Sequence, residues 1–451
     1  MGHSLTWSGG LCAAALALSG CMSDIGGGFD PADMVARMKT PDASQAMKPT
    51  YAEKITADSQ IIQGLSLRSS VLPQGTVSDQ VASAVLAANS RTAEAELRAA
   101  TLRSEAASKN WLPKIGPQVS LTSLGSLAAN LVVDQVLFDN GRRKGERAFA
   151  VADVEVAAVS LAQDTNKRVA TALKLYTTAA EAREAAVLGQ GTLKDMTHFN
   201  WVMEERVKGG VSDMSDLTIL RQKLSEIRAS QEAAMEREAT SISELNAMSI
   251  SPLDAVRGVP DIPVNTFAGE PLAVIRSEAE KTRAIAAAKV ARAGQLPGLS
   301  AGGTVGEGST LGLRVSSDQL LGFGTKASLE AIALAEETST RKVRQSVEDS
   351  NRNLRRLERQ ISAKTRQAAE AATLAAQAKR NLDIFQEQYD AGQRQVMDVV
   401  GVYETYARQQ QTQVVLKYDV VRLKIDMAEI QGVLADGSAI DPEAYLYPDD
   451  H

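Results

Sequence analysis

The chain repeats its own pattern, and this duplication is the feature that most restricts its fold. The stretch WLPKIG at residues 111–116 has a counterpart in QLPGLS at 295–300, 184 positions later (295 minus 111). The stretch DQVLFDNG at 134–141 has a counterpart in DQLLGFG at 318–324, at the same offset. Because both motifs recur in the same order and at the same spacing, the chain is predicted to be a tandem duplication of one structural unit.

Each copy follows the same order of predicted elements. A helical stretch ends at a proline, a strand pair follows, and a long helix leads to a glycine-containing break and a second helix. The predicted divisions are a signal peptide (1–20), an irregular, polar and lipidated arm (21–76), a first repeat (77–250) with a strand pair at about 115–138, a connector (251–267), a second repeat (268–435) with a strand pair at about 298–321, and a tail (436–451).

The strand pairs are rich in β-branched residues and partly alternate between apolar and polar positions, as half-buried strands do. The first pair is predicted at 117–123 and 131–138, around a turn of small residues at 124–130. The second is predicted at 299–305 and 311–317, around the turn GEGST. After each pair a turn leads into a helix, and Asp139 or Asn140 is expected to cap the first amides of the first one.

The longest helical pattern lies in the second copy. From Val347 to Tyr389, mostly apolar or small side chains recur at alternating spacings of three and four residues. This period places them along one side of a helix that supercoils around its neighbours with a left hand. At 1.5 Å per residue, a helix from Gly324 to Tyr389 would be about 100 Å long. The chain is therefore predicted to form rods and not a compact globule.

Two breaks interrupt the helical patterns in the same way. VKGGVSDMSDL at 207–217 and YDAGQRQVMDVV at 389–400 each place glycine and acidic residues inside an otherwise helical stretch. Glycine commonly ends helices, because it adopts positive φ without steric cost. Each break is predicted to be a turn between two helices.

The N-terminus has the layout of a secretory signal. A short apolar stretch from Leu11 to Leu18 is followed by small residues and Cys21, and it is too short to span a bilayer, which takes about 20 residues. LSGC at 18–21 resembles a bacterial lipobox, which implies that Cys21 is acylated and becomes the first residue of the mature chain. Met22 at the next position implies the outer membrane as destination.

Composition and motifs exclude several function classes. The net charge of −6 gives no reason to expect a nucleic-acid partner. No cluster of histidine and cysteine has metal-ligand spacing, and GEGSTLG lacks the lysine of a phosphate-binding loop. The sequence therefore predicts no enzyme, no metal and no cofactor. The scattered methionines at 196, 203, 214, 235 and 248 are expected to have packing roles and not to bind copper.

The order and doubling of these elements resemble the TolC-like outer-membrane efflux proteins, over about residues 80–435. VLFDNGRR after the first strand pair and the two breaks carry the resemblance. It implies a mostly α fold with β strands, in which a homotrimer builds one twelve-stranded outer-membrane β-barrel. A long α-helical coiled-coil tunnel would continue this barrel across the periplasm. The predicted strands agree with an oligomer, because two strand pairs per chain are fewer than the eight strands of the smallest membrane barrels.

The resemblance also implies a function and partners. The chain would be the passive exit duct of a tripartite efflux or type I secretion system, lipid-anchored in the bacterial outer membrane. A periplasmic membrane-fusion adaptor and an inner-membrane ABC or RND-type pump would open its periplasmic tip. The sequence leaves open which pump it serves and what it exports.

The breaks take specific roles under this resemblance. Gly210 and Gly392 would supply positive φ in the tip turns, where the inner helices bend to close the tunnel. The implied gate pairs are Tyr389 with Asp216 and Arg394 with Ser215.

Asp398 is expected to form a ring of three carboxylates in the narrowed lumen. The family carries a second acid three positions later, where this chain has Gly401, so the ring is predicted to be single. The alternative is that Asp213, Asp216 and Asp398 only cap their helices.

A second class of function fits the rods alone: a lipid-anchored periplasmic coiled-coil spacer without a pore. The strand pairs discriminate between the two, because a spacer has no use for two hairpins with equal spacing.

Overall fold

The computed structural model describes residues 51, 55, 58–88, 92–123, 126–263, 269–305, 309–317 and 322–440. The expected signal peptide and the lipidation site Cys21 lie outside these residues. In chain order the elements are α3 (Gln60–Ser66), α4 (Val77–Leu86), α5 (Thr92–Ser108), β1 (Lys114–Ser123), β2 (Ser126–Phe138), α6 (Arg142–Lys208), α7 (Met214–Asn246), α8 (Leu272–Gly294), β3 (Gly298–Val305), β4 (Thr310–Ser316), α9 (Thr325–Asp390), α10 (Val396–Gln431) and the short 3₁₀ helix η2 (Ser438–Ile440).

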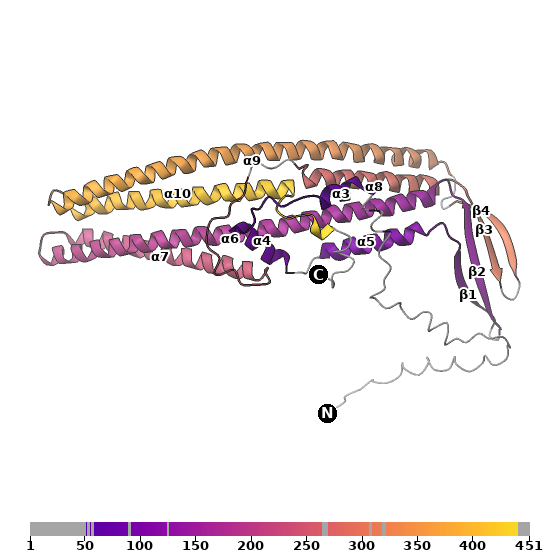
Figure 1. The fold of residues 1–451 in the computed structure, drawn as a ribbon, viewed down its shortest axis with the longest axis horizontal. Coiled ribbons are helices and arrows are strands. Elements are labelled where there is room, and N and C mark those ends of the chain that lie inside the picture. The colour runs from indigo at the N-terminus through magenta and orange to yellow at the C-terminus, as the bar shows by residue number, and fades with distance from the viewer. Residues whose placement is uncertain are drawn as a thin grey trace, which may run out of the picture. The chain divides into compact units, whose positions relative to one another are not determined.

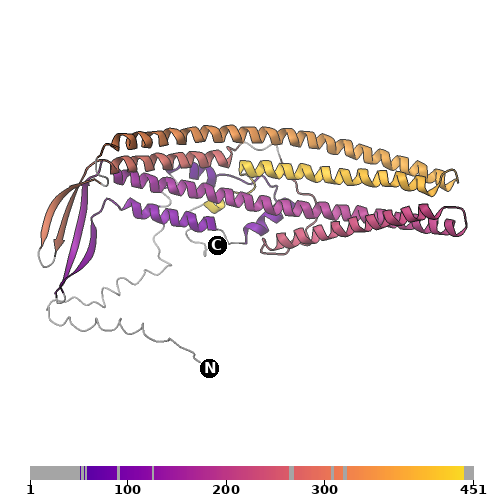
Figure 2. The ribbon, with the colours of Figure 1, turned by 180° about the vertical axis from the view of Figure 1, so that it is seen from behind.

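The same order of elements occurs twice. The run α5, β1, β2, α6, α7 is followed by α8, β3, β4, α9, α10. The two long helices contain 67 and 66 residues, and the helices after them contain 33 and 36. The strands gather at one end of the helices, and the α6–α7 and α9–α10 turns lie at the other end (Figure 1, Figure 2).

The four strands form one antiparallel sheet in the order β1-β2-β3-β4. The first turn is shorter than the sequence suggested: Leu121 pairs with Leu127, and residues 126–130 belong to β2. The small side chains at these positions favoured a turn in the sequence analysis. Strand pairing, however, uses backbone N–H and C=O groups, which each of these residues carries. Of the second predicted strand pair, residues 306–308 and 318–321 lie outside the described part.

Asp139 caps the helix after the first strand pair, as expected. Its two carboxylate oxygens accept from the amides of Gly141 at 3.1 Å and Arg143 at 2.9 Å. Asn140 adopts a φ of 53° and donates to the carbonyl of Pro297 at 2.9 Å. The capping residue thus lies where the chain turns from β2 into α6.

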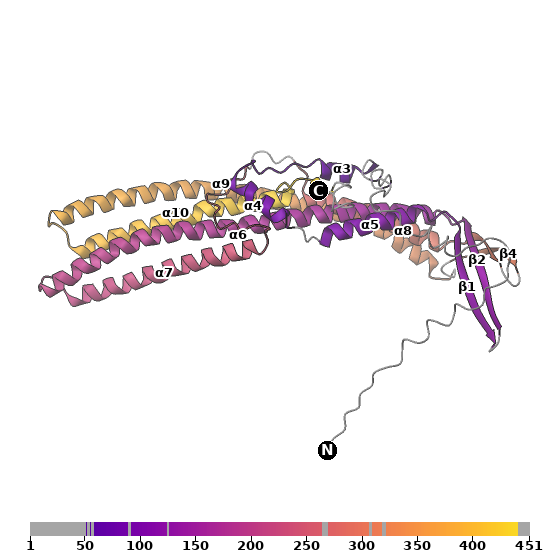
Figure 3. The same cartoon turned by 60° about the horizontal axis from the view of Figure 1, so that its bottom comes forward.

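The long helices pack lengthwise, α6 against α7 and α9 against α10, and the four run side by side toward the turns (Figure 1, Figure 3). A core of aliphatic residues and tyrosines joins α6 to α10 near the middle of α6, and it includes Leu173, Tyr176, Tyr418 and Ile425. Within α9, each buried residue falls on the predicted seam: Ser350, Leu357, Ile361, Ala371, Ala375, Ala378 and Leu382. The seam packs α9 against its neighbours, as its heptad spacing predicts.

The arm expected to be irregular contains a helix. Ser59 caps α3, whose Ile62 and Leu65 are buried against α6. Arg68, after α3, donates to the carbonyls of Gln431 at 2.5 Å and Glu270 at 2.6 Å. The segment thus contacts α6 and parts of the chain more than 200 residues away, which a local pattern could not indicate.

Candidate functional site

The two turns at the end of the helices opposite the sheet form the candidate site. Gly210 has a φ of 71° and Gly392 a φ of 75°, so the positive values expected of both are confirmed. In each turn, the amide after the glycine donates at 2.8 Å to the carbonyl five residues earlier. This is the Schellman arrangement that satisfies the last carbonyls of a helix. The two turns therefore share one backbone geometry.

A side-chain bridge spans each turn at equivalent positions. Arg206 Nε donates to Ser212 Oγ at 3.1 Å in the first turn, and Arg394 Nε donates to Gln388 Oε1 at 3.0 Å in the second. Both bridges join residues six positions apart. The arginine lies before the glycine in the first turn and after it in the second. The Arg394 guanidinium also lies 4.5 Å from the centroid of the Phe385 ring, within cation–π range. Arg394 is thus held within its own turn.

Acidic residues beside the turns cap the helices that follow. Asp213 Oδ1 accepts from the amide of Ser215 at 3.1 Å. Asp398 accepts from the amide of Gln395 at 3.2 Å, and the Gln395 side chain completes a capping box. Asp213 and Asp398 therefore both accept from amides at the helix starts within one chain. The carboxylate ring of Asp398 stays a prediction about the assembled trimer.

The predicted gate pairs do not form within one chain. Among the hydrogen bonds of the described residues, neither Tyr389 with Asp216 nor Arg394 with Ser215 occurs. Tyr389 is half-buried and packs against the apolar cluster at the tip. The latch remains a prediction about the closed tip of the assembled trimer.

An apolar cluster holds the two helical hairpins together behind the turns. Met196 and Met203 are almost completely buried in it, in agreement with a packing role, whereas Met214 is 58% exposed and Met235 47% exposed, so the packing expected of these two is wrong. Its buried members are Met196, Phe199, Met203, Leu217, Leu220, Leu224, Leu382, Val396, Val399, Val400 and Tyr403.

Polar contacts link α6 to α10 above this cluster, and the sequence did not reveal them. The Tyr403 hydroxyl donates to Asp195 Oδ2 at 2.6 Å. The Tyr418 hydroxyl and the Lys417 ammonium donate to the same Glu184 oxygen at 2.9 Å and 2.7 Å. Burial, and then the adjoining carboxylate, raises the pKa of both tyrosines above the ordinary value. Both hydroxyls therefore stay protonated as donors.

Further charged pairs continue these links toward the sheet. Arg422 pairs with Glu181, and Lys174 pairs with Asp426 at 2.7 Å and Glu429 at 2.8 Å. Burial by itself would lower the pKa of Lys174, but its two carboxylate partners raise it. Glu184 and Glu181 on α6 meet Lys417 and Arg422 on α10 in reverse order along the antiparallel pair. At Lys174 the charges are exchanged, with the base on α6 and the acids on α10. This reversed order of charged residues is the sequence signal that could have predicted these pairs.

The sheet has two chemically different faces. Side chains alternate between faces along a strand, and cross-strand partners share a face. On β4, Leu311 is 91% exposed, Leu313 72% and Val315 70%, while Arg314 points to the other face. The apolar face carries Ile115, Pro117, Leu131, Val133, Leu299, Ala301, Val305, Leu311, Leu313 and Val315, with Gln135 among them. The polar face carries Lys114, Gln118, Asn130, Asp134, Ser300, Thr304, Thr310, Arg314 and Ser316, with Val132 and Val136 among them.

Two negative results hold for the described residues. None of the helices there is both long and apolar enough to cross a membrane. No group of three or more histidine, cysteine, aspartate or glutamate side chains in that part of the chain is arranged to hold a metal ion.

Comparison with known proteins gives a match in structure. No protein-family model and no curated sequence matches the chain. The outer-membrane channel OprN superposes with a TM-score of 0.70 at 15% identity, covering 84% of this chain and 96% of that one. The Campylobacter jejuni CmeC outer-membrane channel gives 0.67 at 14%, covering 82% and 90%. The open state of the Neisseria gonorrhoeae MtrE outer-membrane channel gives 0.67 at 14%, covering 83% and 94%.

Proposed function

We propose that this chain, which has the fold of the TolC-like outer-membrane channels, is the passive exit duct of an efflux or secretion system in the bacterial outer membrane. Three copies would assemble around one axis. Their strands would form a single twelve-stranded barrel in the membrane, and their helices a tunnel across the periplasm. The protein would carry out no chemistry of its own and need no cofactor.

The two-sided sheet is the observation that carries this proposal. An apolar face of exposed leucines and valines opposite a polar face is the pattern of strands with lipid on one side and water on the other. Strands β1 and β4 lie at the two edges of the sheet, and an edge inside a membrane must find a partner strand. Four strands are too few to close a barrel, so the edges support assembly of several chains.

The helices supply a wall of suitable length. With 67 residues in α6 and 66 in α9, each would be about 100 Å long at 1.5 Å per residue. The spacer alternative explains the helices equally well, but it leaves the exposed apolar face of the sheet without a role.

The tip is the proposed point of control. A periplasmic adaptor that binds the open tip more tightly than the closed one would shift the equilibrium toward opening. Energy would then come from an inner-membrane pump of the ABC or RND type. The proposed gate residues are Ser215, Asp216, Tyr389 and Arg394, with Asp398 lining the constriction.

Cys21 is the proposed lipid attachment site. Acyl chains contribute about 0.8 kcal/mol per buried CH₂, but a barrel would hold the protein in the bilayer without them. Cys21→Ala is expected to leave a trimer in the outer membrane. A variant recovered as soluble periplasmic protein would contradict the barrel.

Planar-bilayer recording of the purified protein tests the duct. We expect stepwise conductance from wild type. Leu313→Arg places a charge on the apolar face, which costs about 2–4 kcal/mol at the bilayer midplane, and should strongly reduce insertion. Gln118→Arg places the same charge on the polar face and should insert like wild type. Absence of conductance from wild type, or equal insertion of both variants, would refute the proposal and favour the spacer.

A further inference from the structure

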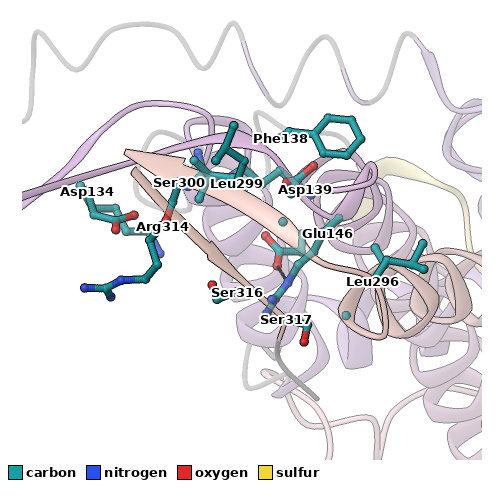
Figure 4. A pocket seen from close by; sticks show the side chains of 17 residues that line it. Asp134, Phe138, Asp139, Glu146, Leu296, Leu299, Ser300, Arg314, Ser316 and Ser317 are labelled. Carbon is teal, nitrogen blue, oxygen red and sulfur yellow. Dashed lines mark hydrogen bonds and ion pairs between the residues drawn. The ribbon is translucent and has the colours of Figure 1, made fainter. Parts of the chain in front are cut away.

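A cavity of about 320 Å³ lies where the polar face of the sheet meets the start of α6 and the end of α8 (Figure 4). Among the described residues, its walls contain four basic and three acidic side chains. Figure 4 shows Asp134 and Arg314 on the strands, and Glu146 on the helical side. The charged residues that line it are Lys114, Asp134, Asp139, Arg142, Arg143, Glu146 and Arg314.

Three of these charges are already engaged by their own surroundings. Asp139 accepts two amides at the start of α6. Arg142 donates to Glu146 at 3.0 Å, and Glu146 also accepts from Asn110 at 3.0 Å. These groups are satisfied without a ligand, so they do not indicate one.

The remaining charges are unbalanced. Within the part of the chain that the structure describes, Lys114 and Arg314 form no ion pair, and the buried Arg143 Nη1 has no hydrogen-bond partner. Among the described residues that line the cavity, Asp134 is the one acid not engaged in this way. A buried guanidinium nitrogen without an acceptor is costly, and the exposed side chains of Lys114 and Arg314 line the same cavity.

The register of the strands places two glycines beside the charged residues of the sheet. Lys114 pairs with Asp134, which pairs with Gly302, which pairs with Gly312. A Cβ on Gly302 would lie 3.7 Å from Asp134 Oδ2, so a larger residue there would fill the space beside the acid. Two of these four positions therefore carry no side chain, and Lys114 and Arg314 both line the cavity.

We propose that this cavity binds an oxyanion, a carboxylate, phosphate or sulfate group carried by the solute in transit. The inference rests on the proposed function, in which the polar face lines the lumen. Guanidinium groups recognise such groups through paired hydrogen bonds. Three copies around the axis would form a cationic girdle at the junction of barrel and tunnel, which concentrates anions there.

Ion selectivity in planar bilayers tests the girdle. Replacing Lys114, Arg143 and Arg314 together by Gln should lower the chloride-to-potassium permeability ratio about fivefold, which is ~1 kcal/mol at 298 K. Asp134→Asn should raise the ratio. Arg143→Gln alone should lower it, whereas the matched control Arg237→Gln, on the exposed side of α7, should not. An unchanged ratio in the triple variant would overturn the inference.

Calorimetric titration of inorganic phosphate into detergent-solubilised protein makes the test independent of conduction. Wild type and Arg237→Gln should bind equally, and the triple variant at least tenfold more weakly. If the triple variant loses its helical circular dichroism, Arg314→Gln, at an exposed position, replaces it. If wild type conducts but binds no phosphate, and the triple variant leaves the permeability ratio unchanged, the anion site is rejected and the duct proposal stands. Phosphate binding without conduction rejects the duct and supports the site.

Discussion

Gly392→Ala isolates the energetic role of a tip turn. Gly392 has a φ of 75°, and a Cβ built there meets nothing within 4 Å. The substitution therefore adds no clash, and its cost is the backbone strain of an L-residue in the left-handed region, roughly 1–2 kcal/mol. We expect the second turn to open more readily by this amount in each chain.

Gly401→Ala is the matched control. Gly401 lies inside α10, nine positions further along the chain (401 minus 392), and its Cβ position is equally open. Alanine is favoured over glycine in a helix interior by about 0.8–1 kcal/mol. The change from glycine to alanine should therefore stabilise the helix at position 401 and destabilise the turn at position 392.

Hydrogen exchange provides the measurement. The amide of Gln393 donates to the carbonyl of Gln388 at 2.8 Å only while the turn is intact. Its exchange should be about 5–30 times faster in Gly392→Ala, the factor that corresponds to 1–2 kcal/mol. It should be unchanged or slower in Gly401→Ala. Equal exchange in wild type and Gly392→Ala would show that the turn does not depend on the glycine.

Three further predictions concern the tip. Tyr403→Phe removes a hydrogen bond to a carboxylate and should destabilise the α6–α10 contact by about 1.5 kcal/mol, measured by thermal unfolding followed by circular dichroism. The control Tyr406→Phe, whose hydroxyl donates no described bond, should lose less stability. Equal losses in the two variants would contradict this reasoning. Asp398→Asn keeps a cap acceptor but removes the charge, so cation preference and divalent block should fall while the helix content stays the same; unchanged selectivity would exclude the ring. Tyr389→Phe combined with Arg394→Ser should raise single-channel conductance if the latch forms between chains, and an unaltered conductance would reject it.

Local signals predicted the features that depend on neighbours in sequence. The seam from Val347 to Tyr389 followed from its spacing, because a helix repeats its faces every three to four residues. The tip glycines followed from their positions inside helical patterns, because few other residues adopt positive φ. The cap at Asp139 followed from its place just before a helix. Except for the packing along the seam, the interaction that determines each of these features joins residues at most six positions apart in the chain.

The sequence misjudged features whose partners are distant. The turn predicted at 124–130 is mostly strand, because pairing within the sheet outweighs the turn preference of small residues. The helix α3 forms within the arm because α6 buries Ile62 and Leu65. Within one chain, Arg394 contacts Gln388 and Phe385, which the sequence pattern did not indicate.

By itself, the sequence determined a duplicated chain of long helices, two strand pairs and two glycine turns, since these depend on local spacing and backbone preference. Only the tertiary structure decided which side chains meet. Tyr403 lies 208 positions from Asp195 in the chain, and the cavity gathers Lys114, Arg143 and Arg314 from two strands and a helix. Such meetings depend on strand register and helix packing, because shifting a register by one residue moves a side chain to the opposite face.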